Sequence, residues 1–274
     1  MYYYIVDPQK ISQNDFERVQ NQLYSSTSQY RVSGEVVRAT GLRTVSQLVE
    51  NAFAHDAKTI VAVGSDETLH DVINAVGSRD MVIGFVPLFD SEIGSTLGLI
   101  NIPQAAKTLG ARRIEELDLG SVNNNLFLSK LSFGASQVSS GSRLNLFNFR
   151  RLQSLMNLPL IEIKFAADGQ YQASIKVVGG VIVNGFSDPT DGVLDISMLS
   201  QLSRWQVFKY RREIAVGNYE KIPGSAVIHV QRLEITAPDG LPLRVGSRIV
   251  ARAPAVIEVK PKALKIIVGK ERMF

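Results

Sequence analysis

The sequence of 274 residues contains no cysteine. This absence excludes a disulfide framework, a zinc–thiolate cluster and a catalytic thiolate. Histidine is also scarce, and the three histidines, at positions 55, 70 and 229, are too far apart to predict a metal cluster. The motifs GxxxxGK(S/T), GxSxG and HExxH are missing as well, so the sequence does not predict a P-loop, an α/β-hydrolase or a zinc protease.

Long hydrophobic runs are missing too. No apolar run reaches the roughly 18 to 20 residues of a membrane span, and the start, MYYYIVDPQK, lacks the basic flank and cleavage site of a signal peptide. We therefore expect a cytoplasmic protein, with peripheral contact at the inner membrane surface as a further option. The formal net charge is +4 and the pI about 9.2. This small excess is either a solubilising charge or an attraction for an anionic partner.

The first hundred residues alternate short apolar segments with amphipathic ones. Their spacing predicts strands at residues 2–6, 35–40, 59–63 and 81–86 and helices at residues 14–23, 44–54 and 69–76, with Asn14 as the first N-cap. Uninterrupted apolar strands between such helices are typical of a parallel sheet with both faces covered. Ligands of these sheets bind beyond the carboxyl ends of the strands, which places Asp7, Thr40, residues 64–68 and residues 87–92 on one rim.

The pattern changes after about residue 115. Short strand candidates, separated by Gly, Asn, Asp and Pro turns, lie at residues 126–133, 161–165, 171–178, 181–183, 194–198, 226–231, 233–236 and 249–251. We expect one helical interruption, at about residues 144–156. The sequence thus predicts an α/β domain over residues 1–118 and an antiparallel β domain over residues 119–254. The apolar segments 255–259 and 264–268 either finish the β domain or make residues 255–274 part of the first domain.

Several segments resemble one protein family. VGSDETLHDVINAV, residues 63–76, is similar to the GGDGTLNEVVNGL-type signature of the diacylglycerol kinase catalytic-domain family. Further similar segments follow the family's order: IVDP, VPLFDSEIGSTLGL, FLSKLSFGAS, VIVNG, DGVLDISML and APDGLPL. The resemblance spans nearly the whole chain and implies an NAD-kinase-like parallel α/β domain followed by an antiparallel β-sandwich domain. It also implies a lipid kinase that transfers the γ-phosphoryl group of ATP to a lipid hydroxyl with Mg²⁺.

The resemblance also implies site residues. For the nucleotide, they are Gly64, Ser65, Asp66, Glu67, Thr68, Asp71 and Ser91, to which the rim of strand ends adds Thr40. Asp239 matches the general base for the lipid hydroxyl, and Asp191 matches a ligand of a structural metal. Each position also has a structural explanation. Residues 65, 66 and 68 are typical helix-capping types, and the Asp-Gly pairs at 191–192 and 239–240 are ordinary turns.

The sequence departs from the family pattern at several of these positions. Ser65 and Glu67 stand where the family has glycine, and if either position needs a positive φ, a side chain there costs about 1 kcal/mol. Asp7 replaces the usual asparagine, residues 87–93 lose the GTGND core, and Leu241 replaces a glutamate. The rim would then carry five carboxylates, from Asp7, Asp66, Glu67, Asp90 and Glu92.

Two functions therefore stay open. One is a divergent lipid kinase, and the other is a catalytically inactive member that acts as a lipid- or protein-binding module. A kinase of NAD or another soluble acceptor is a third reading, but the intact DGVLD segment favours the lipid branch.

The segment RWQVFKYRR, residues 204–212, interleaves basic and aromatic side chains. It is either a solvated face or a contact for anionic lipid headgroups. Because no nucleic-acid-binding module accompanies it, we expect no nucleic-acid partner. The other expected partners are a lipid substrate and a second copy of the chain, in a homodimer.

Overall fold

The structure is a computed structural model, which describes residues 1–8, 11, 13–134, 160–184 and 188–274. The helix expected at residues 144–156 lies outside the described residues. The chain divides into two compact units, the first made of Met1–Asp118 with Pro261–Phe274 and the second of Leu119–Lys260.

A parallel sheet forms the centre of the first unit. Its strands, in spatial order, are β2 (Gly34–Arg38), β1 (Tyr2–Val6), β3 (Thr59–Gly64), β4 (Val82–Pro87) and the last part of β16 (Ala255–Ile267). Every residue of β3 is buried, because strands lie on both sides of it and helices cover both faces of the sheet. This burial explains why the strand is continuously apolar rather than alternating.

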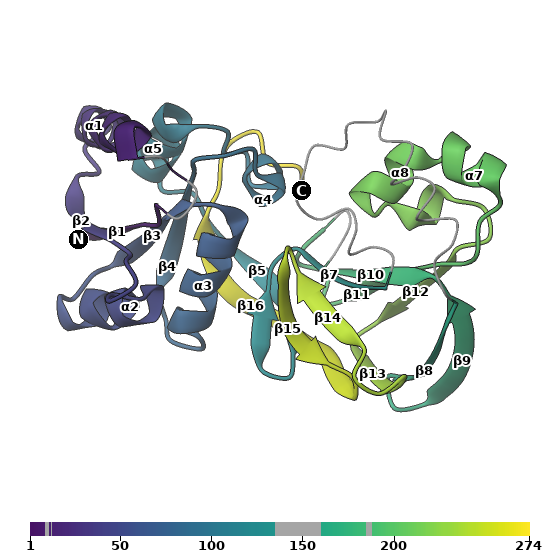
Figure 1. Ribbon diagram of the computed structural model, residues 1–274. Helices are drawn as coiled ribbons and strands as arrows, with labels where there is room; N and C mark the ends of the chain where they lie inside the picture. Colours follow the sequence, from purple (N-terminus) through teal and green to yellow (C-terminus); the bar gives the residue numbers. More distant parts are fainter. Residues whose placement is uncertain (9–10, 12, 135–159, 185–187) are drawn as a thin grey trace. The chain divides into compact units, whose positions relative to one another are not determined.

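Helices cover both faces of this sheet (Figure 1). They are α1 (Gln13–Gln29), α2 (Val45–Ala54), α3 (Asp66–Val76), α4 (Glu92–Thr96) and α5 (Ile102–Ala111). α1 packs against α5, and α2 packs against α3. Helix α2 buries Leu48, Val49 and Ala52, the face that its 3.6-residue period predicts. Among the described residues, none of the helices is both long and apolar enough to cross a membrane.

Two helix starts differ from the expectation. Helix α1 begins at Gln13, so Asn14 lies inside its first turn and not at the N-cap. Helix α3 begins at Asp66 and not at residue 69, because Ser65 is already its N-cap. The residues expected to form a loop around a phosphate therefore include the first helical turn.

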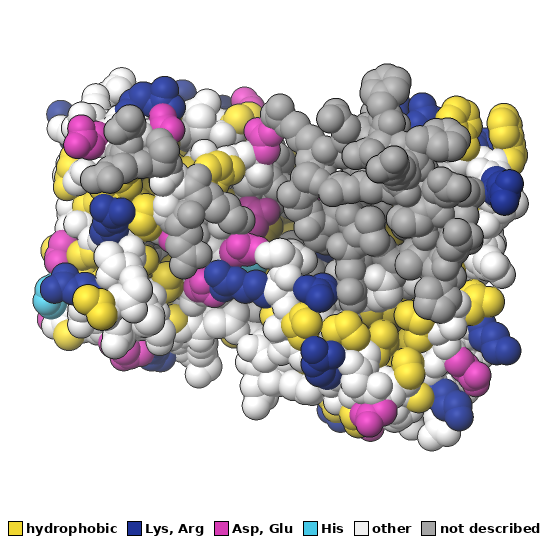
Figure 2. Space-filling model, viewed as in Figure 1, with side chains coloured by type: hydrophobic (Ala, Val, Ile, Leu, Met, Phe, Trp, Pro, Cys, Tyr) yellow, Lys and Arg dark blue, Asp and Glu magenta, His cyan; other side chains and the backbone are white. Residues whose placement is uncertain are grey.

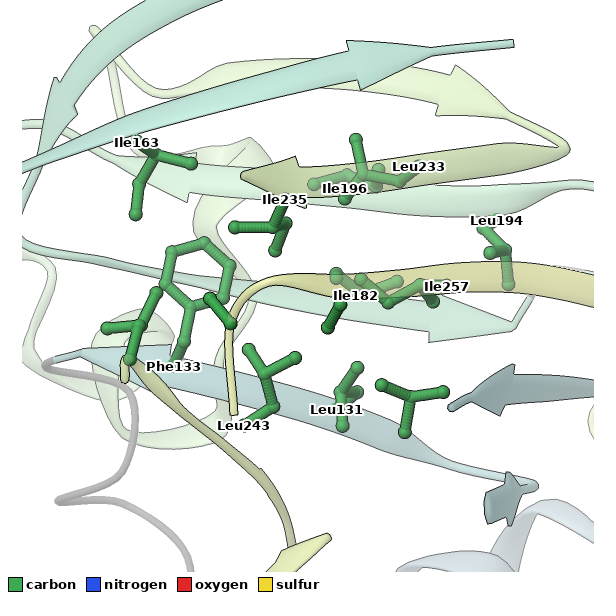
Figure 3. Packing of buried hydrophobic residues seen from close by; sticks show 14 of the residues in the cluster. Leu131, Phe133, Ile163, Ile182, Leu194, Ile196, Leu233, Ile235, Leu243 and Ile257 are labelled. Atoms are coloured by element: carbon green, nitrogen blue, oxygen red, sulfur yellow. The ribbon is translucent and has the colours of Figure 1, made fainter. Parts of the chain in front are cut away.

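The second unit is built from two antiparallel sheets. One contains the first part of β16 with β13 (Arg232–Ala237), β8 (Ile161–Ala167) and β9 (Tyr171–Val177). The other contains, in spatial order, β12 (Ala226–Val230), β11 (Leu194–Leu199), β10 (Gly179–Asn184), β7 (Lys130–Gly134), β14 (Pro242–Val245) and β15 (Arg248–Arg252). The sheets enclose a common apolar core. Figure 3 shows Leu131, Phe133 and Ile182 from one sheet and Ile163, Ile235 and Ile257 from the other.

Three strand expectations need correction. Residues 126–133 form two strands, β6 (Asn125–Phe127) and β7, and the two segments expected near the C-terminus form the single strand β16. This strand runs through Pro261, which lies between the stretch paired with β13 and the stretch paired with β4. The missing N–H of proline therefore removes no bond of either ladder. The sequence analysis also missed β14 and β5 (Ile114–Val122).

The second unit also contains helices that were not expected. Helices α7 (Arg204–Lys209) and α8 (Arg211–Val216) follow β11, so the expectation of a single helical interruption in this unit is wrong. Helix α7 starts with a capping box between Ser203 and Gln206. This S-x-x-Q signal was visible in the sequence, but each helix has only six residues, too few to display a period.

Candidate functional site

The junction between β3 and α3 is a capped helix start. Ser65 is the N-cap, with φ −94° and ψ 174°, and its backbone N–H donates to the hydroxyl of Thr68 over 3.2 Å. Asp66 and Glu67 lie in the first turn, where carboxylates interact favourably with the helix dipole. Neither Ser65 nor Glu67 has a positive φ, so the strain expected for a non-glycine residue at these two positions does not arise.

A buried hydrogen bond connects this helix start to β1. The hydroxyl of Thr68 donates to Oδ2 of Asp7 over 3.0 Å, and both residues are buried. The backbone N–H of Asp7 donates in turn to the carbonyl of Val63 over 3.0 Å. Gly64 makes this approach feasible, because a Cβ at that position would lie 2.5 Å from Oγ1 of Thr68. Glycine is therefore favoured at position 64 because a side chain would clash, and not because the backbone has a positive φ.

The carboxylate of Asp66 points to the start of α4. It accepts a short hydrogen bond from the hydroxyl of Ser91 and further bonds from the backbone N–H groups of Ile93 and Glu92. Burial raises the pKa of Asp66 above its ordinary value, and these donors counteract only part of that shift. The hydroxyl of Ser91 also accepts from the N–H of Gly94 over 2.6 Å. Asp66 and Ser91, both predicted site residues, thus contact each other.

A pocket of about 870 Å³ opens beside the carboxyl ends of β1 and β2. Its lining includes Asp7, which was predicted to lie on the rim, and the predicted nucleotide-binding residues Thr40 and Asp71. The hydroxyl of Thr40 accepts from the backbone N–H groups of Leu42 and Arg43, over 3.3 and 3.1 Å. The start of α2, at residues 44–46, also lines the pocket. The lining does not include residues 64–68 or Ser91.

Arg38 and Asn74 are among the lining residues that were not predicted from the sequence. Arg38 is the last residue of β2, and its guanidinium lies 4.4 Å from the ring centroid of Phe16. Asn74 lies three residues after Asp71 on α3, hence on the same helix face. The position of Arg38 at the carboxyl end of a parallel strand was the signal that could have identified it.

Asp239 and Asp191 lie in turns of the second unit, and both are exposed. Asp239 precedes Gly240, whose φ is +74°, in the turn between β13 and β14. Oδ1 of Asp191 accepts from the N–H of Val193 over 3.0 Å. Within the described ranges, no three His, Asp or Glu side chains form a group suited to a metal ion. Asp191 therefore fits a Mg²⁺ site in which it is the one carboxylate ligand and in which water and carbonyl oxygens supply the other ligands.

Both parts of the chain match family models. Residues 2–122 match the diacylglycerol kinase catalytic domain, and residues 136–268 match the YegS C-terminal NAD kinase beta sandwich-like domain. A curated relative, the "Probable lipid kinase YegS-like" protein of Pseudomonas aeruginosa (strain UCBPP-PA14), is 26% identical over 175 residues. This match covers 56% of the present chain and 58% of the relative, less than two thirds of its length.

Solved structures share the fold. The crystal structure of a putative diacylglycerol kinase from Bacillus anthracis str. Sterne has a TM-score of 0.80 at 17% identity, covering 99% of this chain and 97% of that one. The NAD kinase from Archaeoglobus fulgidus in complex with ATP has a TM-score of 0.58 at 13% identity, covering 100% and 96%. The predicted architecture, an NAD-kinase-like α/β domain followed by an antiparallel β-sandwich domain, is confirmed.

Proposed function

The chain is a divergent member of the diacylglycerol kinase family, and we propose that it transfers the γ-phosphoryl group of ATP to the hydroxyl group of a lipid. The observation that carries this proposal is the pocket at the carboxyl ends of β1 and β2. It combines a cation, Arg38, with the hydroxyl of Thr40, the amide of Asn74 and the start of a helix. Phosphate oxygens are bound in proteins by groups of these kinds.

In this proposal, the pocket holds the phosphates of ATP. Arg38 would donate charge-assisted hydrogen bonds to phosphate oxygens, and Thr40 and Asn74 would add neutral ones. Asp7 and Asp71 would repel a bare triphosphate, so we expect the nucleotide to bind as its magnesium complex, whose metal neutralises part of the phosphate charge. The hydrogen bonds of Thr68 with Ser65 and Asp7, with Gly64 packed closely against Thr68, would shape the adjoining rim by holding the start of α3 to Asp7.

The chemical step needs a base for the acceptor hydroxyl. Asp239 would take the proton of the lipid hydroxyl while its oxygen attacks the γ-phosphorus and the bond to the bridging oxygen breaks, which leaves ADP and a phosphorylated lipid. The exposure of Asp239 leaves its carboxylate accessible to a substrate. Asp191 would hold a structural Mg²⁺ in the second unit.

A second function is supported by one specific observation. The carboxylate of Asp66 is bound by Ser91 and by backbone N–H groups at the start of α4, so these donors are already occupied by a group of the chain itself. Ser65 likewise serves as a helix cap. An inactive family member that binds a lipid or a protein would keep such internal bonds while no longer binding ATP.

Transfer of label from [γ-³²P]ATP with magnesium into a total lipid extract tests the proposal. The unaltered protein should produce a labelled lipid, Asp239→Asn should not, and the matched variant Glu220→Gln, at another exposed acid of the second unit, should behave like the unaltered protein. Equal labelling by Asp239→Asn would contradict the role of Asp239. No labelling by any variant, with no ATP-induced rise in melting temperature, would overturn the kinase proposal in favour of the binding module.

A further inference from the structure

Helix α7 exposes two aromatic side chains that belong to neither of the two apolar clusters found among the described residues of the second unit. Trp205 is 69% exposed and Phe208 is 52% exposed, and their ring centroids lie 6.3 Å apart. They are three residues apart on α7 and therefore share a face. Large aromatic side chains exposed next to each other on a soluble surface are typical of interaction sites.

The opposite face of this helical hairpin is already packed. Val207 and Ile214 are buried, and they join Tyr219 and Ile222 in an apolar cluster with strands β10 and β11 of the second unit. The hairpin therefore packs on the second unit through other apolar residues and does not need Trp205 or Phe208 for this packing. Their exposure leaves apolar surface that a partner could cover.

The segment that carries these two rings is rich in cations. Residues 203–217 carry four cationic side chains and one carboxylate, a net charge of +3, whereas the whole chain has a net charge of only +4. Arg211 lies 4.9 Å from the ring centroid of Phe208. Arg204 and Arg212 are exposed, and neither forms an ion pair with any of the described residues. In Figure 2, yellow and dark blue side chains lie together over the part that Figure 1 labels α7.

We propose that this α7–α8 surface docks on an anionic lipid bilayer. The surface consists of Arg204, Trp205, Phe208, Lys209, Arg211 and Arg212. Indole and phenyl rings insert into the interfacial region of a bilayer, and adjacent cations attract the anionic headgroups. The choice of a bilayer rests on the proposed function, because a lipid kinase must reach a substrate that lies in a membrane. A second copy of the chain fits less well, because a symmetric interface would place two patches of like charge against each other.

The chain contains its own reporter for this test. Trp205 is the single tryptophan, so the emission of the unaltered protein reports on this surface alone. Without ATP, vesicles of phosphatidylglycerol and phosphatidylcholine in equal amounts should shift the emission to shorter wavelength, and brominated acyl chains should quench it. Pure phosphatidylcholine vesicles should have a much smaller effect, and salt should weaken the binding. Emission that does not change on anionic vesicles would overturn the proposal.

Charge-reversal variants localise the binding. Arg204→Glu with Arg212→Glu should reduce vesicle binding at least tenfold. Lys107→Glu with Lys270→Glu makes the same change in net charge at two exposed residues of the first unit and should leave binding unchanged. Phe208→Ser, which keeps the charge and the reporter, should also weaken binding. Equal losses in the two double variants, with both melting temperatures unchanged, would contradict a localised surface.

Two further measurements separate this proposal from the kinase proposal and from other partners. Phosphorylation of lipid dispersed in detergent, together with absent vesicle binding, would overturn the docking surface and leave the kinase intact. Vesicle binding without phosphorylation would support the surface and count against the kinase. A blue shift with a single-stranded RNA oligonucleotide but not with anionic vesicles would assign the surface to nucleic acid and overturn the bilayer.

Discussion

The hydroxyl group of Thr68 donates a hydrogen bond to the buried carboxylate of Asp7 and thereby holds the first turn of α3 to the end of β1. The two residues are 61 positions apart in the chain. The same hydroxyl accepts a hydrogen bond from the backbone of Ser65, so one side chain connects the helix cap with the rim of the sheet.

Removing this hydroxyl should destabilise the protein. Thr68→Val keeps the shape of the side chain but deprives a buried carboxylate of a donor, and we expect the free energy of unfolding to fall by about 1–3 kcal/mol. Thr68→Ser keeps the hydroxyl and loses one methyl group, so its loss should be about 1 kcal/mol. Urea unfolding measures both values. A serine variant as unstable as the valine variant would show that the methyl group and not the hydrogen bond matters.

Gly64→Ala should also destabilise, because its Cβ would meet Oγ1 of Thr68 at 2.5 Å. We expect a loss of about 1–3 kcal/mol in the free energy of unfolding. Gly41→Ala is the matched control, since a Cβ there has nothing within 4 Å, and its effect should stay within about 1 kcal/mol. Combining Gly64→Ala with Thr68→Ala should cost less than the sum of the two single changes, because the second removes Oγ1, the atom that the new Cβ would approach most closely. Strict additivity would count against the clash.

The raised pKa of Asp66 should make stability depend on pH. Because the folded chain binds this proton more tightly than the unfolded chain, the contribution of Asp66 favours folding at low pH and is lost as the pH rises through the folded pKa. Asp66→Asn removes the titration. The melting temperature of the unaltered protein, relative to Asp66→Asn, should therefore be higher near pH 3.8 than at neutral pH.

Ser91→Ala provides the matched test of that cause. It removes a donor that favours the charged form of Asp66, so the pKa should rise further and the dependence on pH should become steeper. A melting-temperature difference that is constant with pH would show that Asp66 titrates like an ordinary carboxyl group.

Arg38 should be important for nucleotide affinity. It is the single cationic side chain among the described residues that line the pocket, so Arg38→Gln should weaken binding of the magnesium complex of ATP about tenfold, or about 1.4 kcal/mol. Arg43→Gln removes a charge from an exposed residue outside the lining and should change affinity little. Titration calorimetry gives both constants. Equal affinities for the two variants would place the phosphates elsewhere.

The central parallel strands could be predicted from the sequence because both of their faces are buried. Strand β3 is buried along its whole length and therefore reads as one apolar run. Strand β5 was missed because charged residues, Glu115, Glu116 and Asp118, interrupt its apolar residues. Helix α7 was missed because six residues show too little of a period.

The candidate site was only partly accessible. The strand ends placed Asp7 and Thr40 on the rim and the family resemblance implied Asp71, and all three line the pocket. The resemblance did not identify Arg38, for which the signal was its position at the carboxyl end of a parallel strand. The sequence offered helix capping by Ser65 and Thr68 as an alternative to phosphate binding. It could not show that Asp7 bonds to Thr68 or that Asp66 bonds to Ser91, because these tertiary contacts join residues far apart in the chain.

Strand β16 has a consequence for the order in which the protein is made. Pro261–Phe274 belongs to the first unit, although the ribosome synthesises it after the whole second unit, Leu119–Lys260. When the segment Met1–Asp118 has left the ribosome, β4 still lacks the strand that will pair with it. The second unit can therefore be completed before the first, and the unpaired edge of β4 must be kept from other chains until Pro261–Phe274 has been synthesised.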